Sequence, residues 1–374
     1  MALIAAGFMV VSIAPAHAVD LQGSGASFVD PLVQECKASF NKKTGHSYVY
    51  TSTGSSTGVK NADAQIGNFW FSDVAHKAST KRSTVFHAPI VAAPIAVLVN
   101  LPANKDIYLS ATTVAKIFAG EITRWNDPAI RADNNRTVST VIYRKNSQGN
   151  VVVDKSGNPI VLRSGTKSVR YTLPNQPIKV IYRSDGSGTS GNFTAWLNGV
   201  APSVWTKPAN NAFTTAFPGN INAPGNIGRI VGAGQSQGVA GLAAKTKYSI
   251  TYAEKNWGDS FGLRAAAVGN ASGNFAFPDS AATSAFLGEA KQDENGIVSY
   301  DYSTKVAGAY TLGIVSYMLV ETEYKDKAVG AAVKELAEHI LSPECSGAKP
   351  ELGFIVISGT YLEKAKALIA RMNK

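Results

Sequence analysis

Three short loops combine small hydroxylated residues with glycine, each between a strand-like and a helix-like run. They span residues 23–28 (GSGASF), 52–58 (STGSSTG) and 183–190 (RSDGSGTS). Backbone N–H groups at the start of a helix have no partner inside it, and the helix dipole adds positive potential there. Glycine lets the backbone approach an anion, and the hydroxyls supply further donors. One such loop is a common helix start, but three together predict a site that encloses a tetrahedral oxyanion.

Charged residues in and near these loops refine that prediction. Arg183 opens the third loop, and a guanidinium can bind two oxyanion oxygens in parallel. Asp185 either holds Arg183 by a salt bridge or accepts a proton that the ligand carries. Asp73 (FSDV, 71–74) offers a second carboxylate, with a helix cap or a surface acid as the alternative. Near neutral pH phosphate keeps a proton to donate and sulfate keeps none, so a carboxylate in the site favours phosphate.

The elements that would position these loops alternate along the chain. Residues 90–99 and 314–320 are apolar runs that predict buried strands, and residues 327–340 predict an amphipathic helix. The third loop leads into a helix predicted over 191–197. This alternation predicts α/β layers with parallel or mixed sheets. Residues 134–171 differ, because turn sequences separate short apolar runs, and they predict a surface hairpin or a mobile insertion.

Composition limits the class of protein. The chain has 374 residues, enough for two domains, and its 45% hydrophobic and 17% charged residues are typical of globular proteins. The formal net charge is +10, but Lys and Arg form no block of five or six, so we expect no nucleic-acid partner. The five histidines lack metal-binding spacing, and no G-x-S-x-G elbow has a histidine partner. We therefore expect no metal, no cofactor and no catalysis.

The N-terminus and the two cysteines indicate in which cellular compartment the protein acts. Residues 1–18 carry no Lys, Arg, Asp or Glu, contain an apolar run and end in Ala16-His17-Ala18. This pattern predicts a secretory signal peptide over 1–18, with a buried N-terminal strand or helix as the alternative. The mature protein is expected to be soluble and exported, either periplasmic or secreted further. Cys36 and Cys345 are then either a disulfide or two buried thiols.

In these motifs the chain resembles the periplasmic phosphate-binding protein of the high-affinity bacterial phosphate ABC transporter. The matching segments are GSGASF at 23–28, TGSSTG at 53–58, SD at 72–73, FAGEITRWNDPAI at 118–130 and RSDGSGTS at 183–190. The resemblance covers most of the mature chain in order and is weakest at the ends and over 134–171. It implies a two-lobe α/β periplasmic-binding-protein fold (type II-like) with a central cleft. The hinge would be two crossing strands at 90–99 and 314–320. We expect lobe one over 19–90 and 309–374, and lobe two over 91–308.

The resemblance also implies which residues bind the ligand. Asp185 would hold Arg183, and the run 69–71 (FWF) and the turn at 232–236 depart from the family's pattern. The implied protein is a monomer that captures inorganic phosphate and delivers it to the permease subunits of an ABC importer. The alternatives are a receptor for another oxyanion or an organic phosphate, a phosphate-ester hydrolase, and an extracellular adhesive or matrix protein that retains the fold. The implied phosphate contacts are Ser27, Phe28 (through its backbone N–H), Ser55, Asp73, Arg183, Ser187, Gly188 and Thr189.

Overall fold

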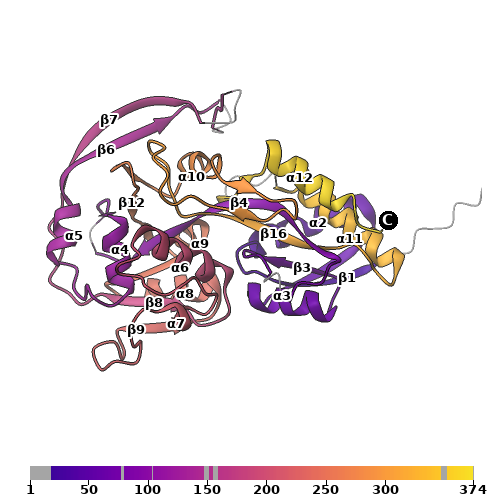
Figure 1. Cartoon of the computed structure of the whole chain (residues 1–374), viewed down its shortest axis with the longest axis horizontal. Coiled ribbons are helices and arrows are strands. Elements are labelled where there is room, and N and C mark those ends of the chain that lie inside the picture. Colours follow the sequence, from indigo (N-terminus) through magenta and orange to yellow (C-terminus); the bar gives the residue numbers. More distant parts are fainter. Residues whose placement is uncertain are drawn as a thin grey trace, which may run out of the picture.

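The computed structural model describes residues 18–76, 80–102, 104–146, 151–154, 159–346 and 352–373. The chain forms two α/β lobes side by side, joined through long central strands (Figure 1). The predicted fold class is therefore confirmed. The signal peptide predicted over 1–18 falls almost wholly outside the described residues.

One mixed sheet runs through both lobes. Its main path is β2-β1-β3-β16-β4-β10-β8-β9, and β11 and β17 also pair with β4. The strands are β1 (Asp20–Gly25), β2 (Ser47–Ser52), β3 (Phe69–Ser72), β4 (Val85–Val99), β8 (Lys179–Arg183), β9 (Ile230–Ala233), β10 (Ser249–Glu254), β11 (Arg264–Ala265), β16 (Gly313–Glu321) and β17 (Ile355–Val356).

Strand β4 links the two halves of this sheet. It is buried along its whole length, as its continuous run of Val, Ile, Ala and Leu predicts. It pairs with β16 as far as Pro94 and with β10 from Ile95 onward. Proline has no N–H to donate, so Pro94 suits the point where the pairing partner changes. The predicted strand at 90–99 lies within β4, and the one at 314–320 lies within β16.

Helices cover the sheet in both lobes (Figure 1). Helix α11 spans the predicted range, whereas α6 begins at Gly188, three residues before the predicted start. Ser187 accepts a hydrogen bond from the Ser190 N–H and so caps α6 earlier than expected. The helices are α1 (Asp30–Glu35), α2 (Lys37–Thr44), α3 (Ser55–Ala64), α4 (Ala111–Phe118), α5 (Pro128–Asp133), α6 (Gly188–Val200), α7 (Phe213–Ala216), α8 (Gln235–Lys245), α9 (Lys255–Ser260), α10 (Ser280–Leu287), α11 (Lys327–Ile340) and α12 (Gly359–Ile369).

Smaller sheets complete the fold. A three-stranded sheet contains β5 (Tyr108–Leu109), β12 (Ala267–Gly269) and β13 (Phe275–Ala276), and β14 (Lys291–Gln292) pairs with β15 (Val298–Ser299). Strands β6 (Asn135–Tyr143) and β7 (Val161–Arg170) form a long antiparallel arm where the sequence predicted a hairpin or insertion.

A disulfide joins Cys36, between α1 and α2, to Cys345, just after α11. It ties the beginning of the chain to its last part across a sequence separation of 309 residues. Within the described residues, no helix has both the length and the apolar character needed to cross a membrane.

Candidate functional site

Four helix starts meet between the lobes, and three of them carry the predicted loops. Ser27 lies just before α1, Ser55 begins α3 and Gly188 begins α6. The fourth is the start of α8, where the Ser236 hydroxyl lies 3.1 Å from that of Ser27. The loops at Ser55 and Gly188 are so close that a Cβ on Gly188 would lie 2.5 Å from the Ser55 hydroxyl oxygen. Donors from both lobes therefore surround one small region.

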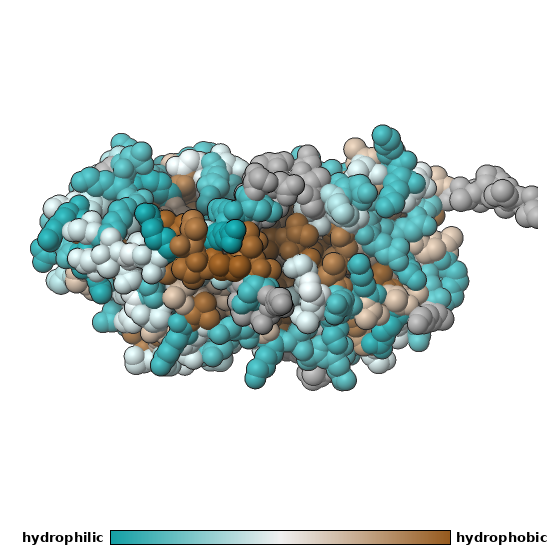
Figure 2. Space-filling model, turned by 90° about the horizontal axis from the view of Figure 1, so that it is seen from above, coloured by the Kyte–Doolittle hydropathy of each residue, from teal (hydrophilic) through white to brown (hydrophobic). Residues whose placement is uncertain are grey.

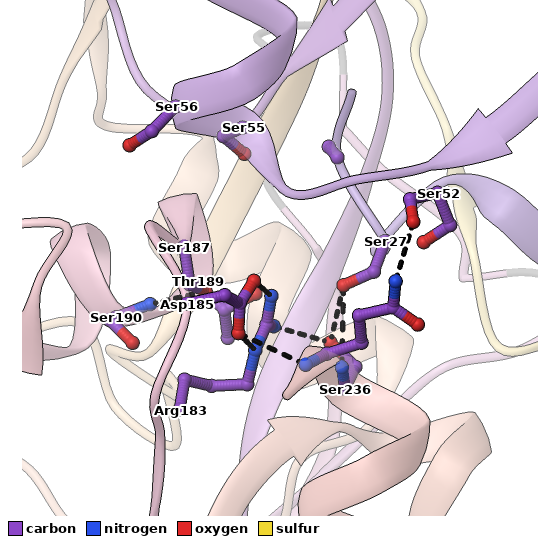
Figure 3. A network of polar contacts seen from close by, with 12 residues as sticks. Ser27, Ser52, Ser55, Ser56, Arg183, Asp185, Ser187, Thr189, Ser190 and Ser236 are labelled. Atoms are coloured by element: carbon purple, nitrogen blue, oxygen red, sulfur yellow. Dashed lines mark hydrogen bonds and ion pairs between the residues drawn. The ribbon is translucent and has the colours of Figure 1, made fainter. Parts of the chain in front are cut away.

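Arg183 is the central cation of this region. It lies at the end of β8 and is only 1% exposed. Its Nε and Nη2 donate to the two Asp185 oxygens at 2.7 and 2.6 Å, and its Nη1 donates to the Ser236 hydroxyl at 2.9 Å. Figure 3 shows the guanidinium between Asp185 and the Ser27–Ser236 pair. The side chain is thus fixed on one edge by a carboxylate, and the opposite edge faces the serines.

The charges of Arg183 and Asp185 support each other. Burial opposes the charge on Arg183, but its bonds to Asp185 outweigh this effect and hold its pKa above the ordinary value. Burial likewise opposes ionisation of Asp185, but its bonds to Arg183 and to the Gln235 N–H keep its pKa below the ordinary value. Of the two roles considered for Asp185, the geometry supports holding Arg183 in place.

Asp73 follows β3 and is 3% exposed. Its carboxylate accepts hydrogen bonds from Ser55 at 3.1 Å and from Ser316 at 2.7 Å. Burial, together with the nearby Glu254, raises the pKa of Asp73 to about 7, although both serine bonds and Arg183 act in the opposite direction. Asp73 can therefore either hold or accept a proton near neutral pH.

Glu254 is a site residue that the sequence did not reveal. It ends β10, is fully buried and accepts a hydrogen bond from the Thr189 hydroxyl at 2.6 Å. Its other oxygen, Oε2, has no hydrogen-bond partner among the described residues. Nothing in its surroundings (TYAEK, 251–255) distinguishes it from an ordinary strand end. Ser316 was missed for the same reason, because it is an isolated serine in a strand. Ser236 lies in the turn at 232–236, which the sequence marked only as a departure from the family's pattern.

The remaining predicted residues lie in the same region but differ in what they contact. The Ser187 hydroxyl is the cap of α6, and its N–H donates to the Asn211 carbonyl at 3.0 Å. Thr189 is 1% exposed in the first turn of α6. Phe28 is fully buried, and its ring packs edge-on against Phe354 at a centroid distance of 5.4 Å.

Direct hydrogen bonds close the region between the lobes. The Ser56 N–H donates to the Gly186 carbonyl at 3.0 Å, and the Asn192 amide donates to the Asp73 carbonyl at 2.7 Å. A cavity of about 240 Å³ adjoins Asp73, and Asn192 is among the residues that line it. Apart from Asp185, whose side chain is 22% exposed, the site side chains are buried.

This arrangement is suited to binding an oxyanion rather than to transforming one. It offers helix N-termini, hydroxyls and one fixed guanidinium as donors, and buried carboxylates that accept protons. Among the described residues, no group of three or more His, Cys, Asp or Glu side chains could hold a metal ion.

The chain belongs to the PBP superfamily, since the model of the PBP superfamily domain matches residues 12–344. Two curated relatives from Mycobacterium tuberculosis carry the name phosphate-binding protein. PstS 3 is 28% identical over 333 residues, which cover 86% of this chain and 76% of that protein. PstS 2 is 28% identical over 370 residues, which cover 94% of this chain and 86% of that protein.

Solved structures share the fold. The phosphate-bound high-affinity periplasmic phosphate-binding protein PfluDING superposes with a TM-score of 0.65 at 20% identity, over 93% of both chains. A phosphate-binding protein from Stenotrophomonas maltophilia gives a TM-score of 0.64 at 19% identity, over 94% of both chains.

Proposed function

We propose that this protein is an exported receptor that binds inorganic phosphate between its lobes and delivers it to an ABC importer. One observation carries the proposal. Arg183, fixed by Asp185 and fully buried, faces the hydroxyls of the first loop and α8, while Asp73 lies among the same convergent helix starts. The names of the curated relatives support phosphate as the ligand.

The proposed phosphate contacts come from both sides of the cleft. The lobe-one side comprises Ser27, the Phe28 N–H, Ser55 and Asp73, and the lobe-two side comprises Arg183, Ser187, Gly188 and Thr189. To these we add Glu254, whose Oε2 has no hydrogen-bond partner among the described residues and can accept a hydrogen bond from the ligand. In this proposal lobe one takes residues 19–90 and 309–374, and lobe two takes 91–308.

To deliver phosphate, the protein must release the bound anion without making or breaking a covalent bond. Opening of the lobes around β4 exposes the anion, and we propose that the permease subunits of the importer bind the open edges of the cleft. We further propose that residues 1–18 are removed on export and that the mature protein acts as a periplasmic monomer.

Isothermal titration calorimetry of residues 19–374, refolded to remove bound ligand, tests the proposal. We expect tight one-to-one binding of phosphate, no heat with sulfate, and no phosphate binding by Arg183→Ala. Arg131→Ala removes an exposed arginine from α5 in the same lobe and should bind like the wild type. If refolded wild-type protein gave no heat with phosphate, the proposal would be wrong, and other oxyanions or organic phosphates would be titrated next.

A further inference from the structure

The β6–β7 arm, defined here as residues 134–171, concentrates the positive charge of the chain. It contains seven Lys or Arg residues and one Asp, a net charge of +6, whereas the whole chain carries +10. The arm leaves the body near α5 and projects along the upper edge of the molecule (Figure 1). The phosphate site uses none of its residues.

Two cations near the base of the arm have local partners. Lys167 pairs with Asp106 at 2.7 Å, and Arg136 lies over the Phe275 ring at 5.6 Å. Arg144, Lys145 and Arg163 are exposed, and none forms an ion pair with another described residue. Within the part of the arm that the structure describes, its outer region therefore carries three cations without an anionic partner.

Exposed aliphatic side chains accompany these cations. Ile142 is 44% exposed and pairs across the strands with Arg163, and Leu162 is 65% exposed at the irregularity beside it. Val161 and Val153 are 47% and 48% exposed. Seen from above, brown hydrophobic side chains gather in the middle of the molecule, with hydrophilic ones around them (Figure 2). A partner that made only ionic contacts with the arm would leave these four aliphatic side chains of the arm exposed to water.

The arm is held in a fixed place on the body. Val138 and Val169 are buried in a cluster with Tyr108 and Phe275. Farther out, the Tyr143 hydroxyl donates to the Ala307 carbonyl at 2.6 Å. Two points of attachment therefore hold the arm against the body.

We propose that this arm binds the surface of an anionic lipid bilayer. Arginine and lysine bind lipid phosphates, while exposed aliphatic side chains enter the boundary between headgroups and acyl chains. Each cation near an anionic surface raises partitioning about fivefold. Such binding would hold the protein at the membrane, which is where the proposed function requires delivery, but it does not depend on the phosphate site.

Co-sedimentation with vesicles tests this proposal. The mature protein is mixed with vesicles of phosphatidylglycerol and phosphatidylcholine, or of phosphatidylcholine alone, at low and high salt. The triple variant Arg144→Gln, Lys145→Gln and Arg163→Gln removes the free cations. A matched variant, Lys42→Gln, Lys60→Gln and Lys325→Gln, removes three exposed lysines from lobe one. A third variant, Ile142→Ser with Leu162→Ser, removes the aliphatic contact.

We expect the wild type to bind only the anionic vesicles and to lose binding at high salt. The arm-charge variant should bind about 30- to 100-fold more weakly, and the lobe-one variant should stay within about threefold of the wild type. The aliphatic variant should weaken severalfold, and all variants should keep their unfolding transition and phosphate titration. Equal losses in the two charge variants, or no preference for anionic vesicles, would overturn the proposal; an acidic protein would then be the partner to test.

Discussion

At the scale of single residues, Asp73 decides between phosphate and sulfate in our proposal. Its carboxylate accepts a hydrogen bond from the O–H that phosphate keeps, and it repels sulfate, which has no proton to donate. We expect Asp73→Asn to bind sulfate measurably and to bind phosphate about 10- to 100-fold more weakly, because one charge-assisted hydrogen bond is lost. Calorimetry with both anions measures this. Asp259→Asn removes an exposed acid from lobe two and should change neither titration; an Asp73→Asn protein that still rejects sulfate would contradict the account.

The raised pKa of Asp73 also predicts how stability depends on pH. Its pKa is about 7 in the folded protein and 3.8 in the ordinary case, so the folded state holds this proton more tightly. The contribution of Asp73 to the free energy of unfolding should therefore decrease as pH rises from about 4 to 7, and level off above.

Urea unfolding of phosphate-free wild type and Asp73→Asn at pH 5 and pH 8 isolates this effect from other titrating groups. The stability of the variant relative to the wild type should increase by about 2 kcal/mol between the two pH values. Parallel behaviour of the two proteins would show that Asp73 titrates normally.

Single residues also show what sequence can and cannot predict about the site. Ser27, Ser55 and Arg183 could be proposed from the sequence because each belongs to a loop in which glycines and hydroxyl residues occur together. Glu254 and Ser316 lie in strands from distant parts of the chain, and only the folded sheet brings them to Asp73. A buried polar residue without a local motif gives no signal until its neighbours in space are known.

At the scale of elements, the close approach of α3 and α6 predicts a test of closure. A Cβ on Gly188 would lie 2.5 Å from the Ser55 hydroxyl and 2.8 Å from the Asp73 Cβ. We expect Gly188→Ala to keep the lobes apart and to weaken phosphate binding about 100-fold or more, with little change in the unfolding transition. Gly234→Ala is the control, since Gly234 lies at the start of α8, another helix of the site, but its Cβ would meet nothing within 4 Å.

Small-angle scattering distinguishes the reasons for weaker binding. With saturating phosphate the wild type should become more compact, whereas Gly188→Ala should stay extended. A Gly188→Ala protein that becomes equally compact would mean that closure does not depend on this contact.

Elements with a strong periodic or apolar pattern were predictable, and irregular starts were not. Helix α11 and strand β4 carry continuous patterns, so the sequence located both. The start of α6 was missed because Gly188 and Thr189 are weak helix formers, and only the Ser187 cap places them in the first turn. Nothing in the sequence indicated that β4 changes its pairing partner, because β4 is buried along its whole length and its residues are equally apolar in both halves.

At the scale of the whole molecule, the disulfide joins the two chain segments that we assign to lobe one in our proposal. Because it closes a loop of 309 residues in sequence, it restricts the unfolded chain strongly. We expect Cys36→Ser with Cys345→Ser to lower the free energy of unfolding by about 3–5 kcal/mol. Urea unfolding with and without a reducing agent measures it: the reductant should destabilise the wild type and leave the double variant unchanged. Equal effects on both proteins would assign the change to the reductant itself.

The position of β16 has a consequence for the order in which the chain is made. This strand lies between β3 and β4, although more than two hundred residues are synthesised after β4 and before it. Until β16 has been synthesised, the edges of β3 and β4 that it later joins lack this strand, and the sheet is incomplete at this point. The pairing of β3 with β16, and that of β16 with β4, can therefore form only after more than 300 residues have been synthesised. One of the last strands to be synthesised therefore completes this part of the sheet, and the disulfide to Cys345 can form only after that strand has been made.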